Sequence, residues 1–425
     1  MRVSLWLLGL FGLAVAAALF AGSNPGSVTV FWPPYRVDLS LNLVMVLLLG
    51  AFLTLHLALR ALSALFAIPR EARMWRQRQR ERSMQLSLLD AYSQLVAGRF
   101  VRAKKAAESV LEQVRNLAAS DDKLAYADQL LCTAHLLAAE SAHALQDRGA
   151  REVHYRSALE HASRVVSPEA GEGARLRGAR WALDDRDAAT ALQLLDEVAQ
   201  GAGRRVLALR MRLKAARMAG RTVMALETAR LLAKHHALSQ VAAHGVLRGL
   251  ATELIASAYD PAQLMQVWTR LDPNERVMPD VALAAAMRLL ILQGDVVLSR
   301  EWLLPVWEQM LEQPSALALS QCIDVVRVLE TGFAANAETL EGDWLTRIES
   351  AQLSHPGDPV LQYLAGVTCM RLQLWGKARQ LLQQSLVRLQ DTGLRRDAWR
   401  LLAELALEQG DEQAATEAWK RAAQS

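Results

Sequence analysis

The chain has 425 residues, of which 52% are hydrophobic but only 6% aromatic, so its apolar content is mainly Ala, Leu and Val. This composition is typical of helices and disfavours aromatic-rich β-sheets. With 22% charged residues, the chain is too polar for a polytopic transporter. Its cysteines, Cys132, Cys322 and Cys369, lie far apart, which excludes a disulfide framework and CxxC-type metal sites.

Positive charge is concentrated near the N-terminus. The formal net charge is +4, yet residues 1–69 already carry +2, and residues 70–82 add six arginines against two glutamates. Residues 83–425 therefore carry a net charge of −2. Because nucleic-acid binders need excess positive charge over their binding domain, we expect no nucleic-acid partner.

Two uncharged, strongly apolar segments open the chain, at about residues 3–22 and 39–59. A helix of ~20 residues rises about 30 Å, enough to cross the hydrocarbon core of a bilayer. We expect a transmembrane hairpin over residues 1–60 rather than a cleaved signal peptide, because the second span follows the first at once. The short connection is rich in turn residues, and its Trp32 and Tyr35 suit the membrane–water boundary.

A basic stretch follows the second span, and we expect residues 61–85 to form a juxtamembrane linker helix. Six arginines lie here, whereas the loop between the spans has only Arg36. The positive-inside rule places the arginine side in the cytoplasm, so both termini are predicted to be cytoplasmic. The same arginines favour contact with anionic lipid head groups.

Residues 86–425 repeat a helix–turn–helix pattern, with apolar residues at helical spacing and short Gly/Asp turns. The C-terminal unit is the clearest, with Trp399 on one helix, Gly410 in the turn, and Ala415 and Trp419 on the next helix. This spacing is similar to the tetratricopeptide repeat (TPR), in which small residues let antiparallel helices cross closely.

The same register recurs upstream. Gly366 and Ala378 form the preceding unit, and Ala378 lies 37 residues before Ala415. Earlier repeat-packing positions are Gly98, Ala103, Gly220 and Ala225. We therefore predict an all-α chain, in which the transmembrane hairpin precedes a TPR-like α-solenoid of about eight helix pairs with a concave groove.

Motifs for catalysis are absent from the sequence. There is no GxGxxG after a strand, and no GxxxxGK[ST], HExxH or GxSxG. We expect neither an enzyme nor a bound metal or cofactor. Haem is the alternative, with His56, His154 and His161 as candidate ligands, although each is more simply interpreted as an ordinary helix residue. Cys132 and His135 also share a helix face.

The layout as a whole resembles the HemY family of proteobacterial inner-membrane proteins associated with late haem biosynthesis. The resemblance rests on the opening segment, the FWPPYRVDLS loop before the second span, the arginine-rich linker and the TPR-like repeats. It implies a cell inner membrane location and a link to protohaem or porphyrin metabolism. It implies no catalytic residues. A flavin-dependent protoporphyrinogen oxidase shares the name, but it requires a dinucleotide fold that this sequence lacks.

The leading hypothesis is a non-enzymatic scaffold held at inner-membrane lipids, whose groove binds proteins of haem biosynthesis; an oligomer is compatible with it. One alternative is a haem or porphyrin carrier. Another is a TPR scaffold for envelope assembly, although the absence of a CxxC pair counts against the rubredoxin-like group of such proteins.

Overall fold

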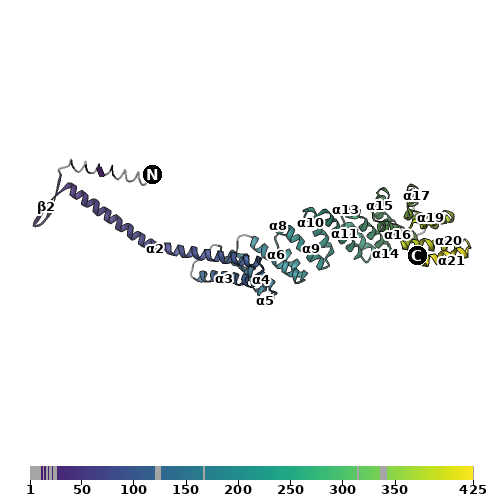
Figure 1. Ribbon diagram of the computed structural model, residues 1–425, viewed down its shortest axis with the longest axis horizontal. Coiled ribbons are helices and arrows are strands. Elements are labelled where there is room, and N and C mark those ends of the chain that lie inside the picture. Colours follow the sequence, from purple (N-terminus) through teal and green to yellow (C-terminus); the bar gives the residue numbers. More distant parts are fainter. Residues whose placement is uncertain are drawn as a thin grey trace. The chain divides into compact units, whose positions relative to one another are not determined.

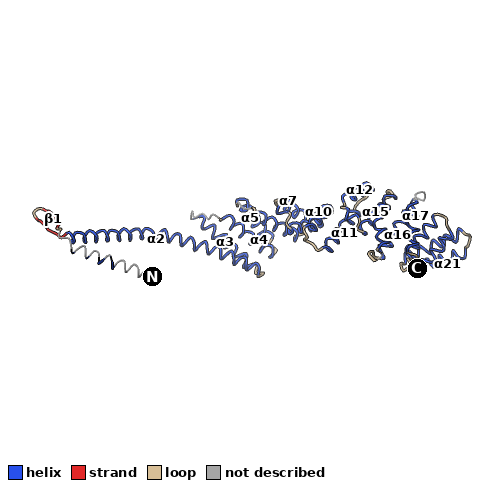
Figure 2. The backbone as a smooth tube through the Cα atoms, turned by 90° about the horizontal axis from the view of Figure 1, so that it is seen from above, coloured by secondary structure: helices blue, strands red, loops and turns tan. Residues whose placement is uncertain are grey.

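The computed structural model describes residues 11–12, 14–15, 18, 22, 26–119, 126–165, 168–313, 315–335 and 342–424. The first predicted span, residues 3–22, lies almost entirely outside the described residues. Within the described ranges the chain is helical apart from one two-stranded hairpin (Figures 1 and 2). It divides into two compact units, Met1–His161 and Ala162–Ser425.

The first unit contains the β-hairpin and the first helices of the repeat array. Its elements are β1 (Ser27–Trp32), β2 (Tyr35–Ser40), α2 (Leu41–Val96), α3 (Phe100–Ala119), α4 (Ala127–Ala144) and α5 (Arg148–Arg164), whose last residues pass into the second unit.

The second unit is a succession of helices in which most helices pack on helices one to three places away along the chain. Its helices are α6 (Glu169–Asp184), α7 (Ala188–Asp196), α8 (Gln200–Gly203), α9 (Val206–Met218), α10 (Thr222–Lys234), α11 (Gln240–Ala256), α12 (Pro261–Arg270), α13 (Pro273–Arg276), α14 (Pro279–Ile291), α15 (Val296–Glu312), α16 (Leu319–Ala335), α17 (Gly342–Ser354), α18 (Pro359–Arg371), α19 (Trp375–Arg388), α20 (Thr392–Glu408) and α21 (Glu412–Gln424).

A β-hairpin stands where the sequence analysis expected only a turn-rich connection. Strands β1 and β2 pair antiparallel from Ser27 opposite Ser40 to Trp32 opposite Tyr35. The two-residue turn is Pro33–Pro34, whose peptide bond is cis, as in a type VI turn. The strands form because β-branched and aromatic residues are frequent on both sides of that turn, and because apolar residues occupy every second position.

Helix α2 is continuous over 56 residues, and so crosses three segments that the sequence analysis separates. The side chain of Ser40 caps its start by accepting a hydrogen bond from the Leu43 N–H at 3.3 Å. Its first part, Leu41–Ser63, is the one helical segment among the described residues that is long and apolar enough to cross a membrane. The end of the same helix packs against α3 and α4 as part of the repeat array.

Among the described residues, eight helices of the array end in the same turn, in which one residue takes a left-handed backbone conformation. The N–H of the next residue donates to the carbonyl five positions back, at 2.8 to 3.0 Å. This bond satisfies a carbonyl that the helix end leaves free. The left-handed residues are Gly98, Gln146, Arg186, Gly220, His236, Gln293, Gln373 and Gly410.

An aspartate follows several of these turns and caps the next helix. Asp147 accepts from the Ala150 N–H, and Asp187 accepts from the Thr190 N–H, both at 3.0 Å. The Thr190 hydroxyl also donates to Asp187, at 2.6 Å. The backbone bond to Asp147, and the hydroxyl and backbone bonds to Asp187, stabilise the charged carboxylates and lower their pKa below the ordinary value. A left-handed residue and a capping aspartate together therefore make the tight reversal between antiparallel helices.

The helix crossings are filled by alanine. In the first unit Ala91 of α2, Ala107 of α3 and Ala138 of α4 contact one another, and all three are completely buried. Methyl-sized side chains allow three helix backbones to approach closely, and a larger side chain here would push them apart. The low aromatic content of the sequence thus reflects how closely the helices pack.

Candidate functional site

The residues predicted to pack the repeats occupy the helix crossings and turns. The alanines Ala103, Ala225, Ala378 and Ala415 are at most 2% exposed. Three of the glycines, Gly98, Gly220 and Gly410, are left-handed turn residues.

Three further repeat-packing positions differ from one another in their surroundings. Gly366 of α18 faces α19 so closely that a Cβ atom there would lie 2.8 Å from Cγ of Leu382. Trp399 is partly buried against the core, with the Arg421 guanidinium 4.8 Å from its ring centre. Trp419 is 42% exposed, so more of its ring faces solvent than a packing role alone requires.

Three histidines converge between α4 and α5. Nδ1 of His135 lies 3.1 Å from Nδ1 of His154, and the rings of His135 and His161 stack with centres 5.8 Å apart. His161 is itself held by Asp128, whose Oδ1 lies 2.8 Å from its Nδ1. Glu108 of α3 approaches His154, with 3.9 Å between its Oε1 and Nε2 of the imidazole.

The surroundings of His135, the central residue of this histidine cluster, disfavour its protonation. Burial first, and then the neighbouring His154, His161 and Arg115, lower the pKa of His135 from 6.5 to about 4. Burial is also the largest cause that lowers the pKa of His154. A neutral His135 can share one proton with His154 across the 3.1 Å contact, whereas two charged imidazoles would repel each other.

The predicted haem candidates divide between two places. His154 and His161 belong to the histidine cluster, whereas His56 lies in the apolar part of α2 and stacks on Phe52. Across the residues that the structure describes, no three His, Cys, Asp or Glu side chains are placed to hold a metal ion. A haem needs only one axial nitrogen, and Asp128 holds His161 in the way that carboxylates orient metal-binding histidines.

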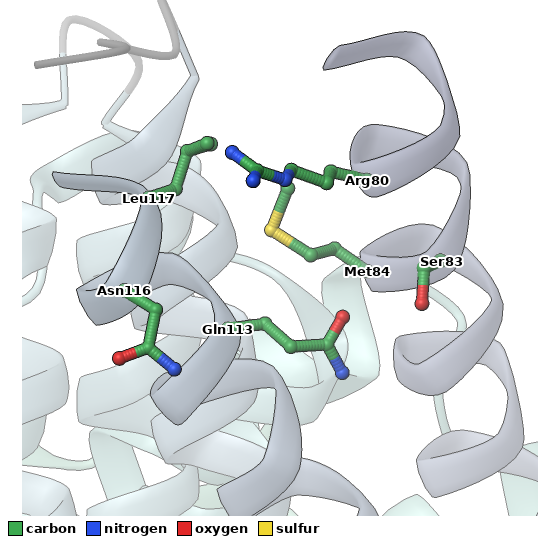
Figure 3. Close-up of a pocket in the computed structure, with 6 residues that line it drawn as sticks. All are labelled: Arg80, Ser83, Met84, Gln113, Asn116 and Leu117. Atoms are coloured by element: carbon green, nitrogen blue, oxygen red, sulfur yellow. The ribbon is translucent and has the colours of Figure 1, made fainter. Parts of the chain in front are cut away.

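A cavity of about 300 Å³ lies between α2 and α3, just beyond the arginine-rich stretch. Figure 3 shows Arg80 extending from α2 across it toward Leu117 of α3, above the sulfur of Met84. Ser83, Gln113 and Asn116 complete the lining. One guanidinium beside hydroxyl and amide groups over an apolar floor suits a polar or anionic group on an apolar stem.

Sequence reasoning predicted neither this cavity nor the contact of His135 with His154. The arginines indicated a basic surface, but only the packing of α2 on α3 makes one of them the edge of a cavity. Likewise Cys132 and His135 were seen to share a helix face. The reversal at Gln146, which carries no glycine signal, is what brings that face against His154.

The fold and these sites define a class: an α-helical repeat protein of TPR type whose first repeat helix also carries an apolar segment of membrane-spanning length. Residues 26–146 match the sequence model of the family described as HemY protein N-terminus. This region runs from the β-hairpin to just past the end of α4, and its match supports the resemblance to the HemY family noted from sequence.

No curated protein matches the chain. Among solved structures it is similar to a chain of the "APC/C hetero-tetramer Cut9-Hcn1", with 14% identity, a TM-score of 0.25, and coverage of 79% of this chain and 65% of that one. It is also similar to the "P58(IPK) TPR Domain", with 15% identity, a TM-score of 0.22, and coverage of 78% and 99%. At these TM-scores the similarities carry no conclusion about function.

Proposed function

We propose that this chain is a membrane-anchored, non-catalytic scaffold that gathers proteins of late haem biosynthesis at the cytoplasmic face of the inner membrane. The observation that carries the proposal is the continuity of α2, which leads from the membrane-length segment Leu41–Ser63 directly into the first helix pair. A helix has no free hinge, so a partner bound to this first pair is held near lipid.

The anchor in this proposal is a two-span hairpin formed by residues 3–22 and 39–59, with both termini cytoplasmic. Six arginines within residues 70–82, against Arg36 alone between the spans, support that orientation. Tethering to a membrane raises the local concentration of bound partners, so that weak contacts along a repeat groove become effective.

Topology is tested by reporter fusions after residue 30 and after the C-terminus. A reporter active only in the cytoplasm should work at the C-terminus and fail at residue 30, and a reporter active only outside should show the reverse. Equal cytoplasmic activity at both positions would refute the two-span hairpin. A control fusion after residue 100, at the start of α3, should match the C-terminal fusion.

Partner binding is tested by crosslinking in intact cells followed by affinity capture from detergent-solubilised membranes. The control is the same repeat array behind an unrelated two-span anchor, which distinguishes partners of the array from partners of the membrane segment. We expect tetrapyrrole-pathway proteins in both captures. Their absence, together with unchanged haem intermediates in cells lacking the chain, would refute the haem assignment.

A haem or porphyrin carrier is the second candidate, and the Asp128–His161 pair favours it. Titration of the purified full chain with haem should then shift the Soret band, and the shift should be lost in His161→Ala but kept in His244→Ala. A flat titration would refute this candidate and leave the scaffold proposal untouched.

A further inference from the structure

The β1–β2 hairpin has two chemically different faces. Successive side chains of a strand point to opposite faces, and directly paired residues share a face. Register therefore places three cross-strand pairs on one face, and all six residues are apolar or aromatic: Val28 with Leu39, Val30 with Val37, and Trp32 with Tyr35. We name this set the apolar face.

The opposite face is polar and internally bonded. Thr29 donates from Oγ1 to Oδ1 of Asp38 at 2.6 Å, and Arg36 pairs with Asp38 at 3.5 Å. Its one aromatic residue, Phe31, has the Arg36 guanidinium 5.6 Å from its ring centre and is 72% exposed. The polar groups of this face have partners or water, so Phe31 is the one apolar side chain that it exposes.

The apolar face is also open, and it has no polar side chain. Trp32 and Tyr35 are 75% and 72% exposed, and Val30 and Val37 are 45% and 47% exposed. A two-stranded hairpin is marginally stable alone in water and needs its apolar side covered. A contiguous exposed patch of this kind marks a contact surface.

The position of the hairpin indicates what covers the apolar face. Ser40 ends β2 and Leu41 begins α2, and the Leu41 N–H donates to the Gly26 carbonyl at 2.9 Å, which closes the base of the hairpin on the helix. Strands of six residues are about 20 Å long at ~3.3 Å per residue, so the whole face lies within that distance of the membrane-length segment. Trp and Tyr are also the residues that favour the head-group region.

We propose that the hairpin lies flat on the bilayer surface at the N-terminal end of α2, with its apolar face in the lipid and its Arg36–Asp38 face in water. The inference rests on the proposed membrane anchoring. The hairpin thereby becomes a second, interfacial contact that fixes the rotation of α2 about its own axis, which a single smooth apolar helix cannot do.

The test is site-directed spin labelling of the full chain in liposomes of mixed zwitterionic and anionic phospholipid, in a background without native cysteines. Single labels are placed at Val37→Cys on the apolar face and at Thr29→Cys on the polar face, both near the middle of the hairpin. Collisions with oxygen, which partitions into lipid, are compared with collisions with an aqueous nickel chelate. A third label at Leu48→Cys reports on the membrane segment itself.

We expect the oxygen-to-nickel collision ratio to be several-fold higher at position 37 than at position 29. Equal, water-like ratios at both positions would refute the inference while leaving the anchor intact, provided position 48 gives a lipid-like ratio. A water-like ratio at position 48 would refute the anchoring as well. Low accessibility to both reagents at position 37 would show that a protein surface covers the face, which also refutes the lipid inference.

Discussion

Acidic pH should destabilise the first unit through protonation of His135. The folded state holds the pKa of this imidazole at about 4, below its ordinary value of 6.5. A group whose pKa is depressed on folding stabilises the fold above its ordinary pKa, and this contribution disappears as pH falls from 6.5 toward 4. After burial, the groups that lower this pKa are His154 and His161 of α5 and Arg115 of α3. Glu108 and Asp128 lie against His154 and His161 rather than against His135.

The magnitude follows from the size of the shift. At ~1.4 kcal/mol per pKa unit, the full depression is worth ~3 kcal/mol, and about 2 kcal/mol of it is lost between roughly pH 7 and pH 5. A loss of ~2 kcal/mol corresponds to an about thirtyfold fall in protection of amides that exchange by local opening. The amides expected to lose protection from exchange lie in α4 and α5, because these helices contact each other through the histidine cluster.

The assay is hydrogen exchange by mass spectrometry on the full chain in detergent, corrected for the intrinsic pH dependence of exchange. Peptides from α4 should lose protection at about pH 5 in the native chain, and much less in His135→Gln, which keeps a hydrogen-bonding group without titrating. His244→Gln, on the exposed side of α11, is the matched control. An equal loss in the native chain and in His135→Gln, or no loss in either, would refute the argument.

Three further substitutions test the repeat array. Gln373→Gly should raise the free energy of unfolding in urea by about 1 kcal/mol, because glycine takes the left-handed turn conformation at lower cost; a decrease would contradict this. Glu275→Gln should lower it by about 2 kcal/mol, since it removes the charge that Arg230 binds at 2.6 Å, and an unchanged midpoint would contradict that. Burial raises the pKa of Glu330, so stability should fall as pH rises above its ordinary value of 4.5. In Glu330→Gln, which still accepts from Tyr363, we expect that fall to vanish in stability curves measured across pH; a persistent slope would assign it elsewhere.

The helical repeat fold was predictable because its signal is periodic and local. Apolar spacing indicated the helices, and Gly98, Gly220 and Gly410 marked three turns where glycine takes the left-handed position. The turns at Gln146 and Arg186 were not predicted, because these residues take the left-handed position in place of glycine and neither residue type signals a turn.

The β-hairpin could have been found from the sequence. Val28, Val30 and Trp32 occupy every second position, and a Pro-Pro pair separates them from the apolar–polar alternation in Tyr35–Ser40. The proximity of two apolar spans favoured a simple loop instead. The histidine cluster could not have been found, because its three members come from two helices whose relative rotation depends on packing with α3.

The part of α2 that follows the membrane-length segment determines how far that segment lies from the first helix pair. Met84, the first residue of the helix whose described side chain is buried in the core, lies 21 residues after Ser63, or about 30 Å along a helix that rises ~1.5 Å per residue. A gap of that height admits a small folded domain, which is also about 30 Å across. In the anchoring proposed above, a peripheral protein on the lipid surface would fit between the bilayer and the first helix pair.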